Sequence, residues 1–318
     1  LRSLVGSEMC IRDSLRWTGY TEVGFSRISV NPSLSIIYKL NYAWRFTVHA
    51  SYKERYGEMT DLYDRPYQTD YRNSVWNCGI LPVYRQQLYS VYGEYKNTAR
   101  EFFATVNLTH NREWYNRIYE QRIENGQIQR VSLPLSNHGS GYTVKSTLSK
   151  GFYDLGLKTS LLALLNISKA EQISGGQRLP YQYRLMRLEP KVIWTPNRHW
   201  ETSYQTDIRY GGSKIGERTR LVPLWNVTQQ VQLSYIFSPI EASFSVDHYH
   251  NDVNEDQSVN AVFADFSVLW KSRRLQITAT ATNLFDKRTY GYTRYASLES
   301  YTSWVRIRPR EFLVAIRY

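Results

Sequence analysis

The chain ends on Phe312-Leu313-Val314-Ala315-Ile316-Arg317-Tyr318. Smaller or polar residues alternate in this stretch with four apolar ones: Phe312, Val314, Ile316 and Tyr318. Successive side chains of a β-strand point to opposite faces, so a period of two places these four on one face. The stretch therefore predicts a terminal strand with one apolar face, and the strand ends on an aromatic ring.

The same alternation recurs upstream. Apolar residues occupy alternate positions in residues 44–50, 227–237, 240–246, 262–270 and 275–281, with polar residues at many of the positions between them. Helical spacing fits none of these segments, so we expect strands with one apolar and one polar face. Thirteen strands are predicted, at residues 22–40, 43–52, 86–95, 100–123, 127–151, 155–168, 181–194, 200–210, 227–237, 240–250, 259–270, 275–283 and 312–318.

Short and long connections alternate between these strands. The short ones are residues 41–42, 96–99, 152–154, 195–199, 238–239 and 271–274, and the long ones are 53–85, 169–180, 211–226, 251–258 and 284–311. The exception is the tight turn at residues 124–126, between two long strands that we expect to project beyond a bilayer. All short turns then lie at one end of the sheet, as in transmembrane barrels with periplasmic turns and extracellular loops.

The terminal strand resembles the last strand of bacterial outer-membrane β-barrels, whose final ring lies in the aromatic girdle at the membrane interface. We therefore predict an all-β protein with the fold of a transmembrane antiparallel up-and-down β-barrel. Single-chain bacterial barrels have even strand numbers, and an open sheet leaves unpaired backbone groups in lipid at several kcal/mol each. Thirteen strands thus predict an incomplete barrel, the C-terminal portion of a larger one.

Composition fits this interpretation. The mean hydropathy is -0.51, and no apolar run approaches the length of about 18 residues that a membrane helix needs. Tyr 27, Trp 9 and Phe 11 favour a membrane interface, where amphipathic rings are common. The net charge is +12, but Lys and Arg are spread along the chain without a nucleic-acid-binding motif, so lipopolysaccharide is the anionic partner that we expect.

Residues 1–14 match nothing that follows. They resemble translated sequencing-adapter read-through, and we expect them to lie outside the fold, with residues 15–318 as the barrel portion and further gene sequence upstream. One of the two cysteines, Cys10, lies in this segment and the other is Cys78, so no disulfide framework is expected.

A motif near the end carries a family resemblance. The run Asn283-Leu284-Phe285-Asp286-Lys287 precedes a Tyr- and Ser-rich loop, the basic residues 306–310 and the terminal strand. This order is similar to that of TonB-dependent receptors, most of all the related outer-membrane barrel proteins of Bacteroidetes. The resemblance implies a twenty-two-stranded barrel in the bacterial outer membrane, so about nine strands lie outside this chain.

The resemblance also implies a function for the parent protein. External loops capture a scarce ligand, such as a siderophore, a glycan or a cofactor, and the TonB complex acts through an N-terminal plug. No plug, TonB box or signal peptide is visible in these residues. Two alternatives stay open: a non-transporting outer-membrane barrel that serves as an adhesin or structural protein, and a soluble all-β binding protein whose apolar stripes are buried in a core.

Two groups of candidate site residues follow from this reading. The terminal-strand residues Phe312, Val314, Ile316 and Tyr318 are expected to serve barrel assembly, with the barrel assembly machinery as partner. Ring-bearing loop residues suit stacking on a ligand, and these are Tyr290, Tyr292, Tyr295, Tyr301 and Trp304. The alternative for the loop residues is that they form the outer aromatic girdle.

Catalytic and metal chemistry find little support. His248 and His250 share one strand face beside an acidic loop, which raises a metal site as one interpretation and a solvated strand end as the other. We favour the strand end, because the carboxylates lack the spacing of a calcium loop. No Ser stands in a Gly-x-Ser-x-Gly setting, and we expect neither an enzyme nor a bound cofactor.

Overall fold

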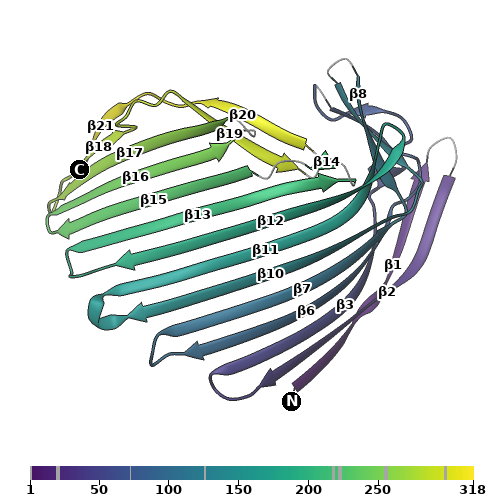
Figure 1. The fold of residues 1–318 in the computed structure, drawn as a ribbon, viewed down its shortest axis with the longest axis horizontal. Coiled ribbons are helices and arrows are strands. Elements are labelled where there is room, and N and C mark those ends of the chain that lie inside the picture. Colours follow the sequence, from purple (N-terminus) through teal and green to yellow (C-terminus); the bar gives the residue numbers. More distant parts are fainter. Residues whose placement is uncertain are drawn as a thin grey trace.

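Most of the strands form one large, curved sheet with an antiparallel wall, and a separate two-stranded hairpin lies beside it (Figure 1). A computed structural model describes residues 2–18, 22–71, 73–124, 127–216, 219–220, 224–253, 257–296 and 299–318. Among these residues, no helix is long and apolar enough to cross a membrane.

In the described part of the chain, fourteen strands make up the wall of the sheet, and each pairs antiparallel with the next. They are β1 (Arg2–Thr18), β2 (Glu22–Lys39), β3 (Trp44–Tyr56), β6 (Val83–Asn97), β7 (Phe102–Tyr115), β10 (Asn137–Phe152), β11 (Leu157–Ser174), β12 (Gln177–Trp194), β13 (Trp200–Ile215), β15 (Leu224–Phe237), β16 (Ile240–Asp252), β17 (Ser258–Lys271), β18 (Gln276–Thr282) and β21 (Glu311–Arg317). This meander confirms the predicted fold class.

The remaining elements lie in the connections. They are the short helix η1 (Met59–Leu62), β4 (Tyr67–Gln68), β5 (Asn73–Trp76), β8 (Ile118–Glu124), β9 (Gln127–Leu133), the short helix η2 (Tyr153–Leu155), β14 (Thr219–Arg220), β19 (Thr289–Ala296) and β20 (Glu299–Arg306). All except η2 belong to connections at the end of the sheet opposite the chain's C-terminus (Figure 1). That end is called the loop end below.

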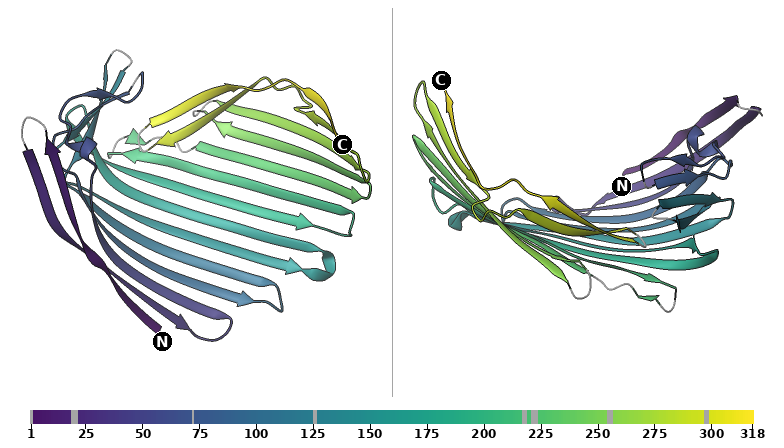
Figure 2. Two further views of the ribbon diagram at one scale, coloured as in Figure 1. Left: turned by 180° about the vertical axis from the view of Figure 1, so that it is seen from behind. Right: turned by 90° about the horizontal axis from the view of Figure 1, so that it is seen from above.

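The sheet is not closed. Among the described residues, β1 pairs only with β2 and β21 only with β18, and the two edges stand apart in the view from above (Figure 2). The predicted direction of the last strand agrees with the structure, because the C-terminus lies at the end that carries the short turns (Figure 1).

Two expectations about the strands need correction. The segments expected as single long strands at 100–123 and 127–151 each break in two, into β7 and β8 and into β9 and β10. The loop expected at 169–180 is wrong, because β11 and β12 continue to a tight turn at Gly175 and Gly176. Both glycines have positive φ, 58° and 76°, as a two-residue hairpin turn requires.

The odd strand number no longer supports an incomplete barrel. Residues 2–18, of which 2–14 were expected to lie outside the fold, run as β1 along β2, so the wall has fourteen strands and not thirteen. That residues 1–14 come from adapter sequence stays a prediction, since strand pairing does not test the origin of a segment. The evidence for an incomplete barrel is instead the two unpaired edges of the sheet, at β1 and β21.

One face of the wall is apolar from strand to strand. Directly opposed residues share a face, and a single row of them crosses six strands: Val48, Val91, Leu108, Val144, Leu165 and Met186. These side chains are between 36% and 48% exposed. The soluble alternative needs such stripes to be buried, so this row argues against it. We call this the outward face and the opposite one the inward face.

Aromatic rings bound the outward face at two heights. On β13 these rings belong to Trp200, which contacts Tyr235 at 4.7 Å between ring centroids, and to Tyr210, which contacts Trp225 at 4.6 Å. Ten positions of about 3.3 Å each, tilted by about 45°, separate the two levels by roughly 23 Å. This height matches the apolar band of about 25 Å in outer-membrane barrels.

Candidate functional site

A hairpin of β8 and β9 leaves the wall at the loop end, on top of β7 and β10. Asn116 fixes the point of departure: its side-chain oxygen accepts a hydrogen bond from the Val83 N–H at 2.9 Å, and its amide donates to the Leu81 carbonyl at 2.9 Å. The bonds hold the chain to the start of β6. Pro134 follows β9 and cannot donate to a ladder, which separates this strand from β10.

The hairpin is held down by strand pairing and by a small apolar core. β9 pairs parallel with β5, and β8 meets β11 where Glu120 lies opposite Ile173. Ile118, Val131 and Ile173 are 0%, 7% and 5% exposed, among the lowest values of the apolar side chains that the structure describes. Among the described residues, buried apolar side chains are therefore few, and three of them lie at this hairpin, while Leu224, Ala261 and Ala264 are buried on wall strands β15 and β17.

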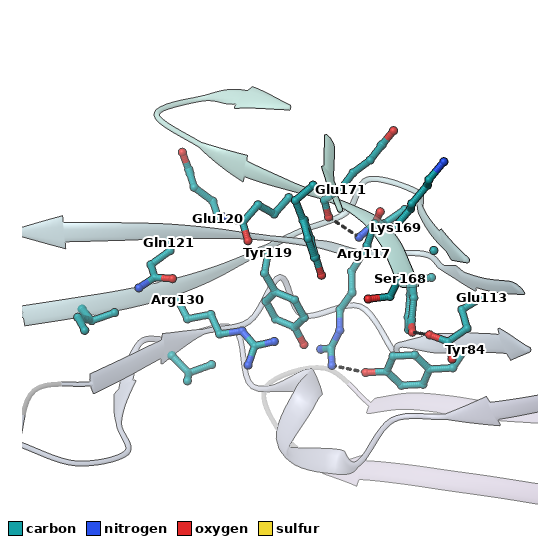
Figure 3. Close-up of a pocket in the computed structure, with 18 of the residues that line it drawn as sticks. Tyr84, Glu113, Arg117, Tyr119, Glu120, Gln121, Arg130, Ser168, Lys169 and Glu171 are labelled. Atoms are coloured by element: carbon teal, nitrogen blue, oxygen red, sulfur yellow. Dashed lines mark hydrogen bonds between the residues drawn. The ribbon is translucent and has the colours of Figure 1, made fainter. Parts of the chain in front are cut away.

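A cavity of about 930 Å³ lies between the hairpin and the inward face of β7, β10 and β11. Tyrosines and charged residues line much of it (Figure 3). The ring-bearing ones are Tyr84, Tyr115, Tyr119 and Tyr181, and the charged ones are Glu113, Arg117, Glu120, Arg130, Lys169 and Glu171. A polar cavity of this size suits a ligand with several hydrogen-bonding groups and a ring face.

Arg117 is the buried centre of this cavity. It is 6% exposed and pairs with Asp61 at 2.8 Å, and it also donates to the Tyr84 hydroxyl (Figure 3). Burial by itself lowers the pKa of Arg117, but the hydrogen bond with Asp61 and the nearby tyrosines outweigh it, so the pKa is raised. The guanidinium is therefore a fixed positive charge that ties η1 and β6 to the hairpin.

Tyr119 lies between two guanidinium groups. The Arg117 group is 4.9 Å from the ring centroid and the Arg130 group only 3.7 Å, a cation–π geometry (Figure 3). Burial raises the pKa of Tyr119 to about 12, against the opposing effect of the two arginines. The hydroxyl therefore keeps its proton at neutral pH and remains a hydrogen-bond donor.

One cation and one carboxylate of the cavity are available to a ligand. Arg130 has no ion-pair partner among the described residues, whereas the Lys169 side chain lies on the outward face of β11, in the same alternation as Leu165. Glu113 accepts hydrogen bonds from Gln86 at 2.9 Å, from Asn111 at 3.2 Å and from the Tyr115 hydroxyl, all neutral donors. The cavity thus offers unpaired positive charge beside tyrosine rings, an arrangement that can hold an anionic ligand with an aromatic or planar part.

The predicted loop residues lie elsewhere at the loop end. Tyr290 contacts Tyr249 at 5.3 Å and Phe263 at 6.3 Å, and its hydroxyl accepts a hydrogen bond from Asn251 at 2.8 Å. Tyr249 and Phe263 stand on the inward face, because Phe263 is opposite Asp247 in the ladder. Tyr290 therefore lies inside and not in an outer girdle.

The other predicted loop residues divide between described and undescribed side chains. Tyr292 stacks on Tyr290 at 6.0 Å, and Trp304 is 64% exposed. The backbones of Tyr295 and Tyr301 belong to β19 and β20, but their side chains lie outside the described part of the chain. Tyr290, Tyr292 and Trp304 do not line the 930 Å³ cavity, and ligand contact by the five residues stays a prediction.

The residues of the terminal strand form an exposed edge. Phe312, Val314, Ile316 and Tyr318 are 74%, 65%, 68% and 95% exposed. In the ladder, Phe312 stands opposite Ala281 and Ile316 opposite Ile277, so the apolar alternation that predicted the strand lies on the outward face. Their role in assembly stays a prediction.

The Asn-Leu-Phe-Asp-Lys motif closes the last long loop. The Asn283 side-chain amide donates to the carbonyls of Lys287 and Arg308, both at 2.8 Å, and its oxygen accepts from the Lys287 N–H at 2.9 Å. Asp286 accepts from the Arg310 N–H at 3.0 Å. Asn283 and Asp286 both have φ of 51°. The motif therefore ties the two ends of loop 283–310 together ahead of the last strand.

The histidine pair has ordinary partners. His250 lies 3.2 Å from Asp252 and 2.8 Å from the side-chain oxygen of Asn260. The acidic residues 254–256 lie outside the described residues. Within the described part of the chain, no group of three or more His, Cys, Asp or Glu residues is placed to hold a metal ion.

Sequence reasoning missed the cavity residues. Tyr115, Arg117 and Tyr119 stand at alternate positions, a pattern that predicts one shared face and combines rings with a cation. The sequence pattern predicted only that the strands flanking residues 124–126 project beyond the bilayer. What the sequence does not show is that the hairpin folds against the inner wall.

Comparison with known proteins shows the fold. No family model and no curated protein matches the chain. Among solved structures, the FrpB iron transporter from Neisseria meningitidis is similar with a TM-score of 0.50 and 9% identity, over 83% of this chain and 44% of that one. The ferric yersiniabactin uptake receptor FyuA from Yersinia pestis has a TM-score of 0.49 and 8% identity, over 92% and 50%.

A third similar structure is FpvA from P. aeruginosa, bound to pyoverdines, with a TM-score of 0.46 and 11% identity over 90% of this chain and 44% of that one. The chain spans about half the length of these solved proteins or less. The wall, its apolar outward face and the similarity to FrpB together define an outer-membrane β-barrel protein with an incomplete barrel. Its location is the bacterial outer membrane.

Proposed function

We propose that this chain is the C-terminal part of a TonB-dependent outer-membrane receptor that imports a scarce ligand: a siderophore, a glycan or a cofactor. The observation that carries the proposal is the cavity at the loop end, which faces inward and sets the unpaired cation Arg130 beside tyrosine rings. A ligand captured there would already stand on the inner side of the wall. The resemblance of residues 283–318 to TonB-dependent receptors supports the same proposal.

The partners follow from the proposed function. The TonB complex acts through a plug domain encoded upstream, lipopolysaccharide surrounds the outer half of the wall, and the barrel assembly machinery receives the terminal strand. These partners belong to the complete protein and not to the residues of this chain alone. The proposal includes the Bacteroidetes-like character and the fragment nature of the chain.

Uptake by cells that carry the complete gene tests the proposal. The cells are given radiolabelled iron as a catecholate chelate or a hydroxamate chelate, radiolabelled cobalamin, or a labelled oligosaccharide. We expect uptake of one of these probes, and its loss when the tonB gene is deleted. Uptake that is unchanged by the deletion contradicts TonB dependence.

Site variants connect the uptake to the cavity. Arg130→Gln should lower binding of the imported probe by about tenfold or more, because one charge-assisted contact of about 1.5–3 kcal/mol is removed. The matched control is Arg273→Gln, which removes the same charge at the β17–β18 turn. Equal effects of the two variants would exclude the cavity as the ligand site.

Upstream sequence gives a second test. A plug domain with a TonB box ahead of the barrel supports import. A signal peptide that leads directly into β-strands instead favours the non-transporting adhesin or structural barrel, and it would overturn the proposal.

A further inference from the structure

A second hollow lies on the outward face, at the end of the wall that carries the short turns. It has a volume of about 590 Å³ and is formed by β3, β6, β7 and β10 with the turn between β6 and β7. We call it the Trp44 groove. In a membrane barrel this face meets lipid, and the short turns lie on the periplasmic side.

Three aromatic rings form the floor of the Trp44 groove. Trp44 stands opposite Tyr95 in the ladder, and their ring centroids are 4.7 Å apart. Tyr95 in turn contacts Phe102 at 5.7 Å. All three belong to the outward face, since they occupy the same alternation as Val48, Val91 and Leu108. The floor is therefore a continuous apolar surface at the level of the aromatic rings that bound the outward face near the short turns.

Two cations stand at the rim of this floor. The Lys150 ammonium donates to the Arg100 carbonyl and lies 5.2 Å from the Phe152 ring centroid. An ammonium has three donors, so further hydrogen bonds remain available. Asn97 accepts a hydrogen bond from the Arg100 N–H at 3.0 Å and donates to the Tyr95 hydroxyl at 3.3 Å, which fixes the turn over the floor.

The positive charge at the rim has no carboxylate to balance it. Within the described residues, neither Arg100 nor Lys150 has an ion-pair partner, and no acidic side chain lines the groove. Glu94, on the neighbouring strand, is paired with Arg45 at 2.6 Å on the inward face. The carboxylate nearest in sequence, that of Glu101, packs over Gly151 on the inward face, so an anion at the rim would meet the two cations on the outward side.

We propose that the Trp44 groove binds one anionic phospholipid of the periplasmic leaflet. The phosphodiester headgroup lies between Arg100 and Lys150, and the first part of an acyl chain lies over Trp44 and Phe102. Charge complementarity selects an anionic headgroup, because basic residues at a membrane surface attract anionic lipid. The apolar floor below the cations selects a lipid over a soluble phosphate. This inference is independent of what the receptor transports.

Lipid retention tests the proposal. The complete protein is reconstituted in vesicles of phosphatidylethanolamine and phosphatidylglycerol in equal amounts and extracted into a mild detergent, and the lipid that stays bound is measured by native mass spectrometry. We expect phosphatidylglycerol to be retained in preference to phosphatidylethanolamine. Equal retention of both lipids, or retention of neither, overturns the proposal.

Variants locate the retained lipid. Arg100→Gln combined with Lys150→Gln should lower the preference for phosphatidylglycerol by roughly 25-fold, since each basic residue near the surface contributes about a fivefold factor. The control pair, Arg273→Gln with Arg274→Gln, removes equal charge at another short turn and should leave the preference intact. A loss of preference of the same size in both pairs would contradict a site at this groove.

The variants should not affect folding, because both side chains are at the surface. Unchanged gel mobility of the unheated barrel checks this point. Trp44→Ser tests the acyl-chain contact separately, because it keeps both cations and removes one ring of the apolar floor. It should speed the loss of bound phosphatidylglycerol while the headgroup preference remains. An unchanged rate of loss would contradict acyl-chain contact with the floor.

Discussion

The substitution Val231→Arg tests which face of the wall meets lipid. Val231 lies on the outward face of β15, opposite Tyr204 and Val246. Four positions separate it from Tyr235, which belongs to the aromatic ring level at the short-turn end. At about 3.3 Å per residue and a tilt of about 45°, these positions correspond to roughly 9 Å of height. The full distance between the girdles is about 23 Å, so Val231 lies close to the middle of the bilayer.

The depth sets the expected cost. An arginine at the bilayer midplane of a barrel destabilises it by about 2–4 kcal/mol, and the cost falls to about 0–1 kcal/mol near the interfaces. Val231→Arg, and Val246→Arg at the same height, should therefore cost about 2–4 kcal/mol. Leu233 is only two positions above Tyr235, so Leu233→Arg should cost markedly less. The neighbouring control is Gln232→Arg on the inward face, between Ser203 and Ser245, where water accommodates the charge.

Urea titration of the complete protein folded into vesicles measures these costs as differences in the free energy of unfolding. The order of cost should be Val231 and Val246 first, then Leu233, then Gln232. If Gln232→Arg is as harmful as Val231→Arg, the assignment of faces is wrong. If all three outward variants cost the same, the depth derived from the girdles is wrong.

Three further predictions concern the loop end. Asn283→Ala removes three hydrogen bonds and leaves alanine at φ of 51°. It should therefore lower the free energy of unfolding, measured by urea titration, by about 2–4 kcal/mol. A cost under about 0.5 kcal/mol would contradict the role of the motif in closing the loop. Burial raises the pKa of Tyr119 from 10.0 to about 12, so the folded protein keeps a proton that the unfolded one loses, and stability falls as the pH rises from about 10 to about 12. Tyr119→Phe should reduce this slope, and an unchanged slope in urea titrations across this pH range counts against burial as its cause. Tyr290→Phe loses the hydrogen bond from Asn251 and should cost about 0.5–1.5 kcal/mol, with faster hydrogen exchange in β19; exchange as in the parent protein would show that the bond does not hold the hairpin.

The wall could be predicted from sequence because its pattern is local. A strand in a barrel wall has one face in lipid and one toward water, so every second residue reports its environment, as Val227–Phe237 and Phe312–Tyr318 do. Strand order followed as well, since short turns join neighbours. Strand length was less accessible: β11 and β12 continue past the bilayer in residues such as Lys169 and Glu171, where no apolar face marks the strand.

The cavity could not be predicted because it depends on how distant segments meet. Asp61 and Arg117 are far apart in sequence, and only the folded loop end brings them within 2.8 Å. The motif at Asn283 was recognised by its resemblance, but its physical role required the carbonyl of Arg308, which lies across a long loop. Nor does composition distinguish a tyrosine of the girdle from one such as Tyr290 that faces inward.

Spin labels along β15 test the central claim, that these strands are the wall of a membrane barrel. A label is placed at each position from Val227 to Tyr235 of the complete protein in vesicles, and its collisions with oxygen, which concentrates in lipid, are compared with those of a water-soluble nickel chelate. We predict that oxygen dominates at odd positions and the chelate at even ones, with the oxygen effect greatest near Val231. The absence of a period of two, or the opposite phase, would contradict the account.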